Sequence, residues 1–168
     1  GYYPALQQQS FSRQANQQQP NLPKTNSVYI PPQTLINAKS DEIKSAMNLV
    51  AQIQHLPADE RYLRQRGINI IFKDGAEAFK LIQDKNVRVE FGDMGDSDAH
   101  AQWISEQNLI MINQKYRGDF SKATLYALSE AIYHEAGHAA LLGDNQASIQ
   151  EEIDCLSLNT LAHRYHTY

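Results

Sequence analysis

Hydrophobic residues recur at the period of an α-helix in five segments of the chain. Residues 40–55 show apolar positions three or four apart, and Ser40 followed by two acidic residues predicts a capped start. Residues 57–67 begin with Pro and end with Gly, which is typical of a short helix. Three further helices are predicted at about residues 76–84, 121–143 and 147–163.

Alternating or continuous apolar runs predict four β-strands between these helices. Residues 68–72 form an Ile-rich run before Asp-Gly, and residues 87–91 alternate between apolar and polar side chains. Two further strands are expected at residues 99–104 and 109–113, and the polar link at residues 105–108 predicts that they form a hairpin. The sequence thus predicts a small mixed or antiparallel sheet.

The order of these elements predicts an α+β fold. N-terminal helices come first, the small sheet lies in the middle, and two helices end the chain. Residues 1–34 differ from the rest, because they contain no Asp or Glu, two triple-Gln runs and five of the six prolines. Such a segment has little apolar surface to offset its ordering entropy. We therefore predict a tail or linker over residues 1–34 and one globular domain over residues 35–168.

Composition and charge exclude several classes of protein. The formal net charge of −4, with 15 basic against 19 acidic residues, does not indicate a nucleic-acid-binding surface. No apolar run approaches the roughly 18–20 residues that span a bilayer. The lone Cys155 excludes an internal disulfide and a cysteine-based zinc site. The chain begins with Gly1, so we expect a processed chain that has lost a signal sequence, and a secreted or periplasmic location in preference to a cytoplasmic one.

The pattern His134-Glu135-Ala136-Gly137-His138 carries the candidate chemistry. On a helix, positions i and i+4 lie on one face, so the two imidazoles can reach the same ion. Zinc accepts neutral histidine nitrogen and, in catalytic sites, keeps one tetrahedral position for water. Glu135 is next to the first histidine and can take a proton from that water. His134 and His138 are thus predicted metal ligands, and Glu135 is the predicted general base.

This motif resembles the active-site helix of the zincin metallopeptidases, which share the pattern His-Glu-x-x-His. The resemblance covers about residues 98–168, namely a strand hairpin, the motif helix and a following helix. It implies a zinc-dependent enzyme that hydrolyses peptide bonds in a peptide or protein substrate. It also implies that the substrate lies extended along the edge strand of the sheet.

The third ligand separates the branches of this family. The metzincin pattern places Gly where this chain has Leu141, and it requires a Met downstream of the motif, whereas all three Met residues lie upstream. Asp144 remains a candidate ligand from that pattern. The gluzincin branch, which takes a Glu from the next helix, fits better, because Glu151 and Glu152 follow on the last predicted helix.

Helix geometry favours Glu152 over Glu151 as the third ligand. At about 100° per residue, Glu152 shares a side of the helix with a set of apolar residues that we expect to be buried. These residues are Ile149, Ile153 and Leu156. Glu151 and Asp144 stay as alternatives, and Asp154 is a candidate acceptor behind a metal-binding imidazole.

Three residues outside the motif are further candidates for the site. His163 lies about 16 Å beyond Glu152 along a straight helix, which is too far for a role in transition-state stabilisation. His100 and Trp103, on the expected edge strand, could line a cleft, although core packing is the favoured role for Trp103.

The alternative function is a non-catalytic zinc-binding module with a regulatory or scaffold role. An intact Glu135 argues against it, because zinc binding alone does not need this base.

Overall fold

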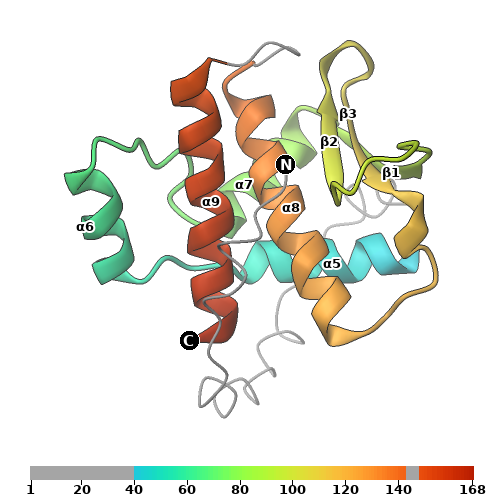
Figure 1. The fold of residues 1–168 in the computed structure, drawn as a ribbon, viewed down its shortest axis with the longest axis horizontal. Coiled ribbons are helices and arrows are strands. Elements are labelled where there is room, and N and C mark those ends of the chain that lie inside the picture. The colour runs from blue at the N-terminus through green and yellow to red at the C-terminus, as the bar shows by residue number, and fades with distance from the viewer. Residues whose placement is uncertain (1–39, 143–147) are drawn as a thin grey trace.

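Five α-helices and one three-stranded sheet follow one another in the part of the chain that the structure describes, residues 40–142 and 148–168 (Figure 1). The structure is a computed structural model. Its elements are α5 (Asp41–Gln52), α6 (Pro57–Gln65), α7 (Gly75–Asp84), β1 (Arg88–Gly92), β2 (Ala101–Ile104), β3 (Leu109–Asn113), α8 (Lys122–Ala140) and α9 (Ile149–Thr167). This order confirms the predicted α+β fold. The predicted tail, residues 1–34, and Asp144 lie outside the described residues.

Polar caps fix where the long helices begin. The hydroxyl of Ser40 accepts from the backbone N–H of Ile43, which confirms the predicted cap, and the hydroxyl of Ser121 caps α8 by accepting from Thr124. Helix α9 ends about four residues later than predicted. Its last turn is held because His166 is buried and its Nε2 lies 3.0 Å from the Ser129 hydroxyl on α8.

The sheet is mixed, with strand order β1-β3-β2. Strand β1 pairs parallel with β3, whereas β2 pairs antiparallel with β3 in the predicted hairpin. A short 3-10 turn over Ser105–Gln107 joins the two hairpin strands. Asn108 then takes the left-handed conformation, with φ of 50°, which Asn tolerates better than most residues. Within residues 40–142 and 148–168, strand β2 pairs with β3 alone, so it is an edge strand of the described sheet, and it lies beside α8.

The predicted strand at residues 68–72 is wrong. This segment pairs with no strand among the described residues, and its backbone is held by a side chain instead. The N–H of Asn69 donates to Asp154 Oδ1 at 3.0 Å, and its side-chain amide donates to Oδ2 at 3.1 Å. Ile71 and Phe72 pack against the helical core. An apolar run that packs on helices has the same composition as a buried strand, so the pattern could not separate the two.

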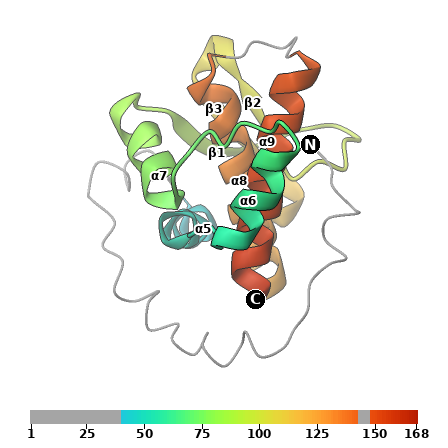
Figure 2. The ribbon, with the colours of Figure 1, turned by 90° about the vertical axis from the view of Figure 1, so that its left-hand side faces the viewer.

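Helix α8 lies at the centre of the fold. It packs against α9 on one side, the edge strand β2 on another and α5 on a third (Figure 1). Figure 2 shows α7 beside α5 and α6 beside α9. Every residue from Leu128 to Ala139 is buried. No helix in the described part of the chain is long and apolar enough to cross a membrane.

Close packing joins α8 to α9 at Gly137. A Cβ atom at this position would lie 2.7 Å from Leu158 Cδ1 and 3.1 Å from Cys155 Sγ. The absence of a side chain therefore lets the two helix backbones approach each other next to His138. This approach brings the predicted motif helix and the predicted third-ligand helix together.

Candidate metal centre

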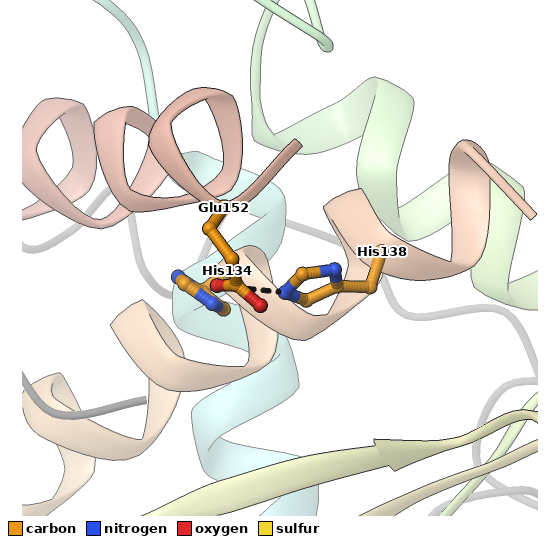
Figure 3. A group of neighbouring side chains, drawn as sticks. All are labelled: His134, His138 and Glu152. Atoms are coloured by element: carbon orange, nitrogen blue, oxygen red, sulfur yellow. Dashed lines mark ion pairs between the residues drawn. The ribbon is translucent and has the colours of Figure 1, made fainter. Parts of the chain in front are cut away.

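Three of the predicted ligands form one cluster. His134 and His138 project from successive turns of α8, and Glu152 reaches toward them from α9 (Figure 3). One ligand atom from each of the three lies within 4.8 Å of the other two. The Nε2 of His138 is 3.5 Å from Oε1 of Glu152. No other group of three His, Cys, Asp or Glu residues gathers in this way within residues 40–142 and 148–168.

The donor set and its spacing fit a zinc ion. Zinc bonds to imidazole nitrogen and carboxylate oxygen at about 2.0–2.2 Å, so two ligand atoms at a tetrahedral angle lie about 3.4 Å apart. The distance between His138 Nε2 and Glu152 Oε1 matches this value. Because all three ligand atoms lie within 4.8 Å of one another, no separation exceeds this value by more than about 1.4 Å. Two imidazole nitrogens and one carboxylate are the protein ligands of one type of catalytic zinc site, in which water takes the fourth position.

Each histidine also has an outer partner on α9. Nδ1 of His138 lies 2.9 Å from Oε2 of Glu151, which leaves Nε2 to face Glu152. The ring of His134 makes a hydrogen bond to the backbone of Cys155. Such outer partners fix the tautomer and orientation of metal-binding imidazoles. The two adjacent glutamates are therefore separated, with Glu152 in the cluster and Glu151 behind His138.

The predicted outer role of Asp154 is wrong. Its carboxylate is buried and accepts hydrogen bonds from Asn69 and from the side-chain amide of Gln150 at 2.8 Å. It holds the segment at residues 68–72 against α9, away from both imidazoles. The reason is helix geometry, because Asp154 lies about 200° around the helix from Glu152.

The expected buried stripe of α9 is also wrong, although Glu152 does face the histidines. Ile149 is 81% exposed and Ile153 is 38% exposed. The buried face is centred near Leu158, about 120° around the helix from Glu152. Glu152 projects from the margin of that face, and its side chain is 51% exposed. The apolar residues in the first two turns of α9 imitate a core stripe but do not pack in the core.

Burial keeps His134 neutral. Desolvation, together with the neighbouring His138, holds the pKa of His134 well below its ordinary value. A neutral imidazole has a lone pair available, and this is the form that binds a metal ion.

Glu135 lies between the cluster and the edge strand. Its Oε1 accepts a hydrogen bond from the backbone N–H of Trp103 at 2.9 Å, and its Oε2 is 3.7 Å from Nε2 of His134. Burial raises the pKa of the Glu135 carboxyl, and the hydrogen bond from Trp103 acts in the opposite direction. One oxygen is thus held by the sheet, while the other faces the predicted ligands.

The side chains of the remaining candidates contact other parts of the fold. Trp103 packs partly buried against the core, as favoured, and His100 stacks on Tyr116 with ring centroids 5.0 Å apart. His163 forms a pair with Glu130 at 3.0 Å. Helix α9 is continuous from Glu152 to His163, so the rise of about 16 Å between them applies.

Sequence reasoning missed three contacts of the site. These are the hydrogen bonds between Glu151 and His138, between Trp103 and Glu135, and between His55 and Tyr133. The contact of Glu151 with His138 could have been inferred from helix geometry. Glu151 and Glu152 are adjacent, so they point in directions about 100° apart and cannot both face one ion. The other two join segments far apart in the chain and have no local signal.

The chain was compared with known protein families, curated proteins and solved structures. No protein-family model matches the chain, and no curated protein or solved structure is significantly similar to it. The geometry of the site therefore carries the functional argument.

Proposed function

We propose that the chain is a zinc-dependent metallopeptidase of the gluzincin type. His134, His138 and Glu152 bind the metal, and Glu135 is the general base. The observation that carries this proposal is the cluster of these three ligands with Glu135 held beside it. A structural zinc site would instead have four protein ligands and would need no carboxylate at the position of Glu135.

The roles of the residues follow from their contacts. When bound, zinc supplies a Lewis acid that polarises a carbonyl group and lowers the pKa of a water molecule. Glu135 accepts a proton from the attacking water through Oε2, the oxygen on the side of His134. The same carboxyl then donates the proton to the leaving amine. Its burial favours this second step, because a raised pKa keeps the protonated form accessible.

The edge strand offers a place for an extended substrate. The backbone N–H of Asn113 donates to His100 at 2.9 Å, so His100 and Asn113 form a hydrogen-bonded pair of the antiparallel ladder. Such pairs alternate along the strand, and Ala101 and Trp103 therefore turn their backbone groups away from β3. The N–H of Trp103 on that side reaches Glu135. A peptide that pairs with this side of β2 would lie beside the proposed base.

Metal content and cleavage test the proposal together. The full chain should bind one zinc ion per molecule and cleave a mixture of denatured proteins. Glu135→Gln should keep the zinc and lose the cleavage, because Gln retains the hydrogen bond from Trp103 but cannot take a proton. Zinc bound without cleavage by either protein would support the non-catalytic zinc-binding module instead. No zinc in either protein would contradict both functions.

A further inference from the structure

A chain of three hydrogen-bonded side chains lies behind the candidate metal centre. Nδ1 of His55 is 2.8 Å from Oε2 of Glu60, and Nε2 of His55 is 2.6 Å from the hydroxyl of Tyr133. His55 lies in the link between α5 and α6, Glu60 lies on α6, and Tyr133 directly precedes His134 on α8. Each ring nitrogen of His55 thus has one partner, the Glu60 carboxylate at Nδ1 and the Tyr133 hydroxyl at Nε2.

The order carboxylate, imidazole and hydroxyl is that of a nucleophilic triad, but the burial argues against that role. Tyr133 is fully buried, and the side chain of His55 is only 1% exposed. The ring of Tyr133 stacks on Phe72 with centroids 5.7 Å apart. A nucleophile must be reachable by its substrate, so the hydroxyl is not placed for catalysis. Instead, the hydrogen bonds from Glu60 through His55 to Tyr133 connect α6 to the helix that carries the proposed metal ligands.

Helix α8 needs such a connection because it has no exposed face at the site. A surface helix is held at one rotation about its axis by an apolar and a polar side. From Leu128 to Ala139, however, every residue of α8 is buried. Side-chain atoms lie about 5–6 Å from a helix axis, so a rotation of about 10° would move a ligand nitrogen by about 1 Å. Zinc sites tolerate only about 0.2 Å in ligand distance. The packing at Gly137 limits this rotation on the side of α9, and polar contacts on the other sides of α8 can limit it further.

The residues before and after His134 each make a hydrogen bond that can limit the rotation of α8. Tyr133, His134 and Glu135 are consecutive and point in directions about 100° apart. Tyr133 is bound by His55 on one side of His134, and Glu135 is bound by Trp103 on the other. Rotation of α8 in either sense would stretch one of these bonds.

We propose that the Glu60–His55–Tyr133 chain is a positioning element that sets the rotation of α8 and, through it, the geometry of the metal ligands. The inference rests on the proposed metal site. It assigns a role to α6, which packs against the rest of the fold mainly through Leu63 and the contact with α9.

Cobalt binding to the full chain tests this role, because the absorption spectrum of cobalt reports the ligand geometry. Tyr133→Phe keeps the ring and its packing but removes the hydroxyl. We expect its affinity for cobalt to fall about tenfold, the lower end of the effect of outer-shell changes, with a shifted spectrum. Ser40→Ala is the control, because it removes a helix cap far along the chain from the ligands and should change neither readout.

If Tyr133→Phe fails to fold, variants of Glu60 test the same positioning role. Glu60→Gln retains an oxygen that can accept from His55 and should bind cobalt like the wild type, whereas Glu60→Ala should bind more weakly. Arg64→Ala is the matched control, because it removes the 4.0 Å ion pair with Glu60 and leaves His55 untouched. Wild-type affinity and spectrum in both Tyr133→Phe and Glu60→Ala would overturn the positioning role while leaving the metal site standing. If the wild type itself bound no metal, the proposed function would fail first.

Discussion

Glu151 and Glu152 are adjacent in sequence, and the structure gives them different tasks that one pair of substitutions can separate. Glu152 faces the two imidazoles, whereas Glu151 accepts from Nδ1 of His138. We predict that Glu151→Ala weakens zinc binding without abolishing it. Glu152→Ala, which removes the proposed third ligand, should weaken it far more.

The size of the effect of Glu151→Ala follows from its contact. The 2.9 Å bond between Glu151 and His138 joins a carboxylate that is 15% exposed to an imidazole that is 9% exposed, so solvent screens it only partly. Loss of an outer-shell carboxylate costs about 10–100-fold in metal affinity, or about 1.4–2.7 kcal/mol. Glu151→Gln should lose less, because its amide oxygen can still accept from Nδ1–H.

Competition with a chromophoric chelator measures these affinities. The titration is done well below the melting temperature, since Glu151 also favours the first turn of α9 through the helix dipole. The expected order of zinc affinity is wild type, Glu151→Gln, Glu151→Ala and then Glu152→Ala. If Glu151→Ala bound zinc more weakly than Glu152→Ala, the assignment of the two glutamates would be reversed. If Glu151→Ala matched the wild type, Glu151 would have no role behind His138.

Three further predictions concern stability, each measured by denaturant unfolding. Gly137→Ala should destabilise the protein by up to about 2 kcal/mol, because overpacking by a Cβ 2.7 Å from Leu158 costs about 1–3 kcal/mol and the better helix propensity of Ala offsets about 1 kcal/mol of this; a gain in stability would contradict the close approach of α8 and α9. Asp154→Ala should cost about 1.5–3 kcal/mol, because it removes the buried carboxylate that accepts hydrogen bonds from Asn69 and Gln150; no loss would show that the segment at residues 68–72 is held in another way. Burial and the nearby His163 lower the pKa of His166 to about 3, so below the unfolded value of about 6.5 the unfolded chain binds more protons. His166 should thus reduce stability by up to about 1.4 kcal/mol per pH unit as the pH falls from about 6.5 toward 3, and His166→Gln should show a correspondingly shallower decline; an equal decline in both proteins would place the proton uptake elsewhere.

Local patterns predicted the elements of the fold well where the signal itself is local. Ser40 and Ser121 are caps, and the polar link at residues 105–108 does join two antiparallel strands. These features depend on residues within a few positions of each other. The parallel pairing of β1 with β3 could not be predicted in the same way, because strand order depends on packing between distant segments.

Apolar composition misled the prediction in two places. In the run at residues 68–72, Phe72 is buried and Ile71 packs partly buried against the core, and an extended segment of this kind looks like a strand in sequence. Ile149 and Ile153 recur at helical spacing but face outward, because the buried face of α9 is set by its contact with Gly137 of α8. In both cases the partner surface, which the local sequence does not contain, decides which residues are buried.

The candidate site could be predicted where a motif carries its chemistry. His134, Glu135 and His138 are spaced for one helix face, and the structure brings His134 and His138 together with Glu152. The bond from Trp103 to Glu135 and the chain from Glu60 to Tyr133 could not be predicted, because each depends on how α8 docks against other elements.

A crystal structure of the chain soaked with zinc, with the metal located by anomalous scattering, would show directly which residues bind the metal. We expect a single zinc ion bound by His134, His138 and Glu152 at about 2.0–2.2 Å, with a fourth position taken by solvent. Glu151 should remain on Nδ1 of His138. A zinc ion held by a fourth protein ligand, or bound by Glu151 or Asp144 in place of Glu152, would refute the proposed catalytic site.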